Sequence, residues 1–134
     1  MHPMHPMRPL ARESTLRLTL GALLLAVALA ASAHSKLVAS QPAEGQRLTV
    51  APAAIELRFN EPVQLTALTL VDAAGRRSRV ALPADTTPRA LERLPVPPLA
   101  AGAWRIEWRA ISADGHPVRG SIRFGIQAQA GPAR

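Results

Sequence analysis

A carboxylate and an imidazole lie two residues apart in the stretch SADGHPV, residues 112–118, between two runs with the alternation of strands. Asp114, Gly115 and Pro117 are ordinary turn residues, but the chemistry of turns does not explain His116. In an extended segment, residues two apart project to the same side, so Asp114 and His116 can converge on one point while Gly115 lets the backbone pass close to it. Pro117 holds the residue before it in the extended region. The loop therefore offers one oxygen donor and one nitrogen donor to a metal ion.

The chemistry open to a second histidine, His34, depends on whether the segment that precedes it is removed. Residues 1–17 carry three arginines against one acidic residue, and the apolar run Leu18–Ala30 and the small residues 31–33 follow. This order is typical of a secretory signal peptide, and the apolar run is too short to span a bilayer comfortably. The segment lacks the pair of adjacent arginines that would indicate export by the twin-arginine pathway. We therefore predict export by the general secretory pathway, cleavage after Ala33 and a mature chain that begins with His34.

A histidine in the first position of a chain offers two nitrogen atoms to the same metal. Its α-amine and its imidazole Nδ1 close a six-membered chelate ring, and the amine titrates at about pH 8, so a divalent cation can displace its proton at neutral pH. The imidazole of His116 and one oxygen of Asp114 complete a set of three nitrogens and one oxygen, which in a tetragonal plane favours Cu(II). The alternative is that His116 is a surface turn residue and that His34 follows the cleavage site by accident.

Sulfur is absent from the predicted mature chain. The sequence has no cysteine, which excludes disulfides, iron–sulfur clusters and thiol catalysis. All three methionines lie in the first seven residues, together with His2 and His5, and are expected to leave with the signal peptide. We therefore expect no metal site in the MHPMHP segment and no sulfur-rich Cu(I) site in the mature protein.

The predicted mature chain is basic. After residue 33 there remain 13 basic and 8 acidic residues, a formal net charge of +5. The arginines are scattered along the chain, many at alternate strand positions, and stacking aromatics are scarce. This pattern favours a solvated face over a binding patch, and we predict no nucleic-acid partner.

Short alternating runs separated by Pro, Gly and Asp predict an all-β sandwich of about seven strands. The clearest runs are 55–59, 65–72, 104–110 and 122–126, and Trp104 and Trp108 are expected in the core. The segment 87–94 is less regular, and the proline cluster 95–98 argues against a central strand. We expect one domain over residues 34–128 and a frayed tail over residues 129–134.

Three stretches make the chain similar to the CopC family of periplasmic copper-binding proteins. They are AHSKLVASQPAEGQRL, IELRFNEPV and AGAWRIEWRAISADGHPVRGSIRFGI, which together cover nearly all of the predicted mature chain. The resemblance implies a seven-stranded, Greek-key, immunoglobulin-like β-sandwich of the cupredoxin-like type in the periplasm. It also implies one Cu(II) bound at the positions that match His34, Asp114 and His116, with Glu61 of the F.EP motif in the second shell, accepting a hydrogen bond from the amine or an imidazole.

The same resemblance implies a role as a copper carrier or buffer in copper resistance, rather than as an enzyme. The implied partner is an inner-membrane copper transporter of the CopD type. Some family members have a methionine-rich loop for Cu(I), and this sequence departs from them. Arginines at the strand edges favour a monomer.

Two other classes of function stay open from the residues alone. A histidine brace on a β-sandwich also holds copper in polysaccharide monooxygenases, but Asp114 would fill the fourth equatorial position, and few aromatics remain for a sugar-binding surface. The other class is a metal-free immunoglobulin-like interaction domain.

Overall fold

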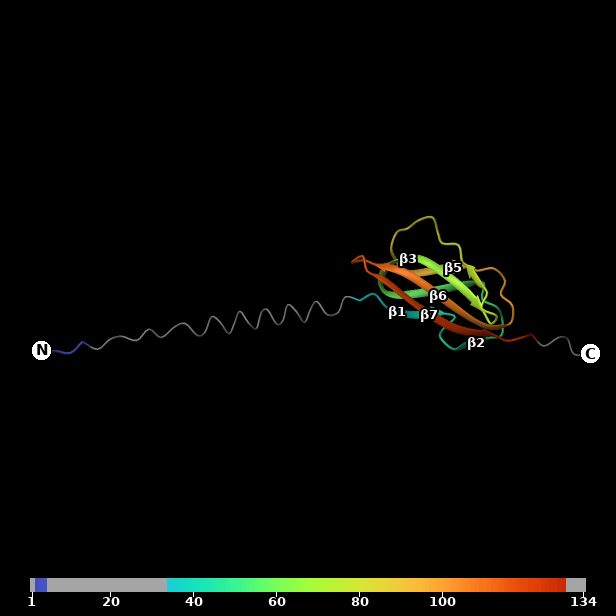
Figure 1. Cartoon of the computed structure of the whole chain (residues 1–134), viewed down its shortest axis with the longest axis horizontal. Coiled ribbons are helices and arrows are strands. Elements are labelled where there is room, and N and C mark those ends of the chain that lie inside the picture. Colours follow the sequence, from blue (N-terminus) through green and yellow to red (C-terminus); the bar gives the residue numbers. More distant parts are fainter. Residues whose placement is uncertain (1, 5–33, 130–134) are drawn as a thin grey trace, which may run out of the picture. The chain divides into compact units, whose positions relative to one another are not determined.

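A computed structural model describes residues 2–4 and 34–129 of the chain. Within these ranges the only regular elements are strands, and no helix long and apolar enough to cross a membrane is present. The strands, labelled in Figure 1, are β1 (Leu37–Gln41), β2 (Gln46–Leu48), β3 (Ala54–Asp72), β4 (Arg77–Arg79), β5 (Arg89–Pro95), β6 (Gly102–Ser112) and β7 (Pro117–Ile126). The contacts divide the chain into Met1–Ala33 and His34–Arg134. Most of the predicted signal peptide and most of the predicted tail lie outside the described residues.

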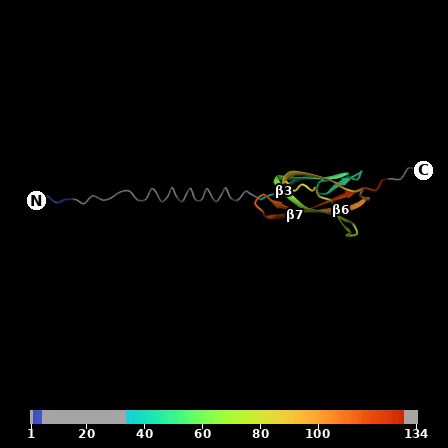
Figure 2. The ribbon, with the colours of Figure 1, turned by 90° about the horizontal axis from the view of Figure 1, so that it is seen from above.

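Strand β3 organises the domain because it belongs to both halves of the sandwich. Its first part, up to Phe59, pairs with β1 on one side and with β5 on the other, and the pairing with β5 resumes at Val63, opposite Arg89. From Val63 onward it pairs with β6 and β4, and the sheet continues through β7 to β2. Figure 2 shows the domain from above, with β6 and β7 side by side. The all-β sandwich is confirmed.

The core is built from the inward positions of the alternating runs. Burial alternates along β3, β6 and β7, as a half-buried strand requires, and the rings of Phe59 and Trp108 pack edge to face with centroids 5.2 Å apart. Trp104 is half-buried against this core and donates from Nε1 to the carbonyl of Ala100 over 2.9 Å. The buried apolar side chains include Ile55, Leu57, Val63, Leu68, Leu70, Leu94, Ile106, Ala110, Ile122, Phe124 and Ile126.

Two strand predictions differ from the structure. The runs 55–59 and 65–72 are parts of the single strand β3, because Pro62 falls between Arg58 and Val63, where the register shifts and no ladder donor is needed. The irregular segment 87–94 contains all of β5 except Pro95. The inward row of this strand includes Glu92, so a buried carboxylate interrupts the apolar alternation. The prediction of no central strand at the proline cluster 95–98 agrees with residues 96 to 101, which form no strand, whereas Pro95 is the last residue of β5.

Candidate metal centre

The loop between β6 and β7 is held in shape by hydrogen bonds to Ser112. The amide of Ser112 donates to the carbonyl of His116 over 2.9 Å, and the amide of Gly115 donates to the carbonyl of Ser112 over 2.9 Å. Gly115 has a φ of 85°, a left-handed conformation that glycine adopts without steric cost. The buried Ser112 hydroxyl accepts from the amide of His116 over 3.1 Å and donates to Oδ1 of Asp114. These contacts fix the direction of both candidate ligands.

Asp114 and His116 form a close pair at the tip of this loop. Nδ1 of His116 lies 2.8 Å from Oδ2 of Asp114, and the two side chains remain 77% and 51% exposed, respectively. Hydrogen bonds from Ser112 and then from His116 lower the pKa of Asp114 from 3.8 to about 2. The carboxylate is therefore ionised at neutral pH and carries the charge that a divalent cation needs in a ligand.

The segment that carries His34 is fastened to β3 by Asn60 and Glu61. Asn60 donates from Nδ2 to the carbonyl of His34 over 3.2 Å and accepts from the amide of Lys36 over 2.7 Å. The hydroxyl of Ser35, which is buried, donates to Oε1 of Glu61 over 2.6 Å. Asn60 was not among the predicted site residues. The signal that could have found it is its position beside Glu61 and Pro62, where the strand changes partner and a side-chain amide can replace ladder hydrogen bonds.

The sheet registers bring the two halves of the predicted site to the same bend of β3. Leu37, three residues after His34, pairs with Phe59, and Ser112, which precedes the loop, pairs with Val63. Phe59 and Val63 are four residues apart, or roughly 13 Å of extended strand. Residues about eighty positions apart in the sequence therefore converge on one end of the domain.

The structure pairs Asp114 with His116 but does not add His34 to them. Within residues 2–4 and 34–129, no three His, Cys, Asp or Glu side chains lie close enough together to hold a metal ion. The carboxylate of Glu61 contacts Ser35 here, and its predicted contact with a metal ligand stays a prediction. In the full chain the backbone nitrogen of His34 is an amide bonded to Ala33, so the predicted amine donor does not exist before cleavage.

The CopC domain family matches residues 37–127, which include both Asp114 and His116. The chain belongs to the CopC family. This finding confirms the resemblance, and it covers the whole sandwich from β1 to the residue after β7.

Three relatives place the chain among CopC proteins from different bacteria. Copper resistance protein C of Pseudomonas syringae pv. tomato is 36% identical over 118 residues, which is 81% of this chain and 93% of that protein. Copper resistance protein C of Escherichia coli is 32% identical over 117 residues, 80% of this chain and 92% of that protein. Copper transport protein CutJ of Bacillus subtilis strain 168 is 36% identical over 103 residues, 70% of this chain but 18% of that protein.

Two solved structures share the CopC fold. The crystal structure of CopC from Methylosinus trichosporium OB3b covers 75% of this chain and all of that chain, with 26% identity and a TM-score of 0.64. The structure of PcoC, described as a methionine-rich copper resistance protein from Escherichia coli, covers 71% of this chain and all of that chain, with 32% identity and a TM-score of 0.51. By contrast, this chain has no methionine after Met7.

Proposed function

We propose that this protein binds Cu(II) in the periplasm and sequesters or carries it as part of copper resistance. The observation that carries the proposal is the Asp114–His116 pair, which is held by the buried Ser112 at the bend of β3 that also fastens residues 34–36. Membership of the CopC family and the names of the relatives support copper as the cargo.

The separation of the pair suits two neighbouring ligands of one copper ion. Metal–nitrogen and metal–oxygen bonds of about 2.0 Å at a right angle place the two ligand atoms about 2.8 Å apart. Nδ1 of His116 and Oδ2 of Asp114 have this separation already, so Cu(II) can replace the proton that they share. The amine and imidazole of His34 supply the other two equatorial donors once the chain has been cut after Ala33.

Glu61 supports the amino-terminal half of the site without binding the metal. Its carboxylate accepts from the hydroxyl of Ser35, the residue after His34, and in the processed chain we propose that it also accepts from the new amine. A carboxylate beside a ligand orients it and increases its basicity. No sulfur donor is available after Met7, so the proposal includes no Cu(I) site.

The proposed partner is an inner-membrane copper transporter of the CopD type. The match to CutJ supports it, because there a region like this chain is part of a longer copper transport protein. Since a small monomer can deliver its ion directly, we propose that the chain acts as a monomer and not as an enzyme.

The test is a Cu(II) titration of the protein purified from the periplasm after export, with intact mass to establish its first residue. We expect one equivalent of Cu(II) with a type 2 tetragonal EPR spectrum and nitrogen hyperfine structure. His34→Ala, Asp114→Ala and His116→Ala should each lower the affinity by at least about tenfold, a loss typical of removing a metal's supporting contacts. Asp85→Asn, which removes an exposed carboxylate from another loop, is the matched control.

Unchanged affinity in all three ligand variants would refute the proposed site. Absence of Cu(II) binding by the correctly processed chain would refute the function and favour a metal-free interaction domain. Copper-dependent turnover of a polysaccharide would instead favour the oxygenase alternative.

A further inference from the structure

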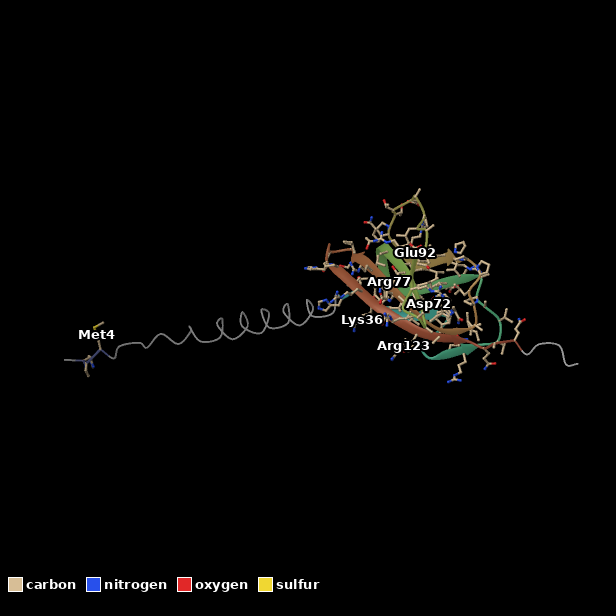
Figure 3. The ribbon with its side chains drawn as sticks, turned by 45° about the vertical axis from the view of Figure 1, so that its right-hand side comes forward. Met4, Lys36, Asp72, Arg77, Glu92 and Arg123 are labelled. Atoms are coloured by element: carbon tan, nitrogen blue, oxygen red, sulfur yellow. The ribbon has the colours of Figure 1, made fainter. Side chains whose placement is uncertain are left out.

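One face of the sheet formed by β4, β3, β6 and β7 carries six arginines. Side chains directly opposite each other in antiparallel strands project to the same face, so the registers define which residues share it. Arg77 and Arg123, both labelled in Figure 3, come from the two outer strands of this group. Three rows cross the face: Arg77, Val71, Arg105 and Arg123; then Arg79, Thr69, Glu107 and Ser121; then Ala67, Arg109 and Arg119.

The middle of this face is hollowed. A cavity of about 730 Å³ lies over the sheet, and short side chains from Ala67, Thr69 and Ser121 line it together with arginines. The arginine side chains that line it are Arg77, Arg79, Arg109 and Arg119. The short residues leave space above the strands, and the long guanidinium side chains form the walls of what we call the arginine groove, defined by these seven residues together with Glu107, Trp108 and Gly120, which also line the cavity.

The charges of the arginine groove are only partly balanced by the protein itself. Glu107 pairs with both Arg77 and Arg105, and Arg123 pairs with Glu44 over 3.1 Å. Within the described residues, no carboxylate lies within 4 Å of the guanidinium groups of the other three arginines of the face, Arg79, Arg109 and Arg119.

Arg109 and Arg119 are also directly opposite each other on β6 and β7. Like charges in this arrangement destabilise a sheet unless an anion lies between them. The groove therefore has both the space and the unbalanced positive charge to bind an anionic group.

The shape and chemistry of the groove favour an acidic peptide over a membrane or a nucleic acid. Interfacial membrane binding needs large apolar side chains, and the exposed ones among the described residues, Met4, Val38, Val50 and Leu91, do not line the groove. Single-stranded nucleic acids are bound through exposed aromatics, whereas Trp108, the aromatic residue that lines this cavity, is only 6% exposed. Planar guanidinium groups bind carboxylates in a bidentate manner.

We propose that the arginine groove binds an acidic extended segment of a partner protein. From Arg79 on β4 to Arg119 on β7 the sheet takes three interstrand steps of about 4.8 Å, a distance that about five extended residues span. Alternate residues of such a segment face the same way, so a segment with Asp or Glu at every second position directs its carboxylates at the groove. The proposal does not depend on copper, because none of the lining residues belongs to the candidate metal centre.

The test measures binding of a fluorescein-labelled decapeptide of alternating Glu and Thr to the purified exported protein, by fluorescence anisotropy in the presence of EDTA. The groove variant is Arg109→Gln with Arg119→Gln, and the control variant is Arg58→Gln with Arg93→Gln, which removes the same charge from exposed positions on β3 and β5. Three other ligands are measured for comparison: the same decapeptide with Gln for Glu, a labelled oligothymidylate and phosphatidylglycerol vesicles. Thermal unfolding of each variant checks that it is folded.

We expect saturable binding of the acidic peptide that the groove variant weakens at least tenfold and the control variant less than twofold. The Gln peptide should not bind. Equal weakening by both variants, or absence of binding by the acidic peptide, would overturn the proposal. Stronger binding of the oligothymidylate or of the vesicles, lost in the groove variant, would also overturn it in favour of those partners. The His116→Ala variant should bind the peptide normally, which separates this result from the copper titration.

Discussion

The hydroxyl of the buried Ser35 donates to Oε1 of Glu61 over 2.6 Å, so the residue next to the predicted amino terminus is fastened to the strand that links the two halves of the sandwich. This contact uses neither a metal nor a free amine. The position of the chain end is therefore set by the fold before any ligand binds.

Glu61→Gln should weaken Cu(II) binding by about 10-fold to 100-fold, the usual effect of removing a charged group that supports a metal ligand. The amide keeps the volume and can still accept from Ser35, so thermal unfolding of the metal-free protein should change little. Competition with a chelator of known affinity measures the loss. Glu56→Gln, on the same strand, is the control, and equal affinities of the two variants would remove Glu61 from the site.

Ser112→Ala should reduce both stability and copper affinity, because it removes the acceptor for the amide of His116 and the donor to Asp114. Loss of a buried hydrogen-bonding partner lowers the free energy of unfolding by about 1–3 kcal/mol. Urea unfolding and Cu(II) titration of the same samples measure the two effects. Ser121→Ala, at an exposed position of β7, should leave both unchanged. Unaltered copper affinity in Ser112→Ala would show that the loop holds its shape without this hydroxyl.

One extra glycine before His34 should lower the Cu(II) affinity by at least about tenfold, because it moves the amine away from the imidazole and breaks the chelate. The core is untouched, so the metal-free unfolding midpoint should stay the same. Intact mass, calorimetric titration and nitrogen hyperfine structure are the measurements. If the extended protein retained full affinity and an identical spectrum, the amine would not be a ligand.

Burial raises the pKa of Glu92, and this shift predicts how stability depends on pH. A carboxyl with a raised folded pKa favours folding fully below its unfolded pKa of 4.5, and this contribution is lost as pH rises through the folded value. Glu92→Gln should therefore be more stable than the parent at pH 7, and the difference should shrink as the pH falls through the folded pKa of Glu92 and be largely gone below pH 4.5. Urea unfolding across this range measures it. A difference that is independent of pH would mean that folding does not shift the pKa of Glu92.

Gly120→Ala should destabilise the domain by about 1–3 kcal/mol, the usual cost of overpacking. A Cβ at this position would lie 2.7 Å from Cζ2 and 2.8 Å from Cε2 of the Trp108 ring, closer than side-chain atoms pack. Gly125→Ala on the same strand is the matched control, since its nearest neighbour would be 3.9 Å away. Equal unfolding midpoints for the two variants would show that the indole moves aside at no cost.

Alternation of apolar residues predicted the core strands well, because each one alternates between a buried and a solvated face. It failed at β5, where Glu92 occupies an inward position, and at Pro62, which sits where β3 changes partner and so does not end the strand. Both failures concern residues whose effect depends on what lies opposite them.

The residues of the candidate site also differ in how far the sequence alone could predict their contacts. Asp114 and His116 are close in the sequence, and the structure places their side chains 2.8 Å apart, but through a turn with Gly115 at a φ of 85° and not through the extended segment that the sequence argument assumed. Their role as metal ligands stays a prediction. The role of Asn60 depends on the register between β1 and β3, which no local pattern gives. The arginine groove was missed for the same reason, since alternation predicts that an arginine faces solvent but not which arginines lie on adjacent strands.

Asn60 hydrogen-bonds the carbonyl of residue 34 and the amide of residue 36. Both contacts are to the main chain, and neither involves the side chain of residue 34. Main-chain hydrogen bonds therefore set the position of residue 34, and its side chain can be changed without removing them. Aspartate, glutamine or an unnatural chelating amino acid at position 34 would be held at the same point of the fold. The domain can therefore serve as a scaffold for designed amino-terminal metal ligands.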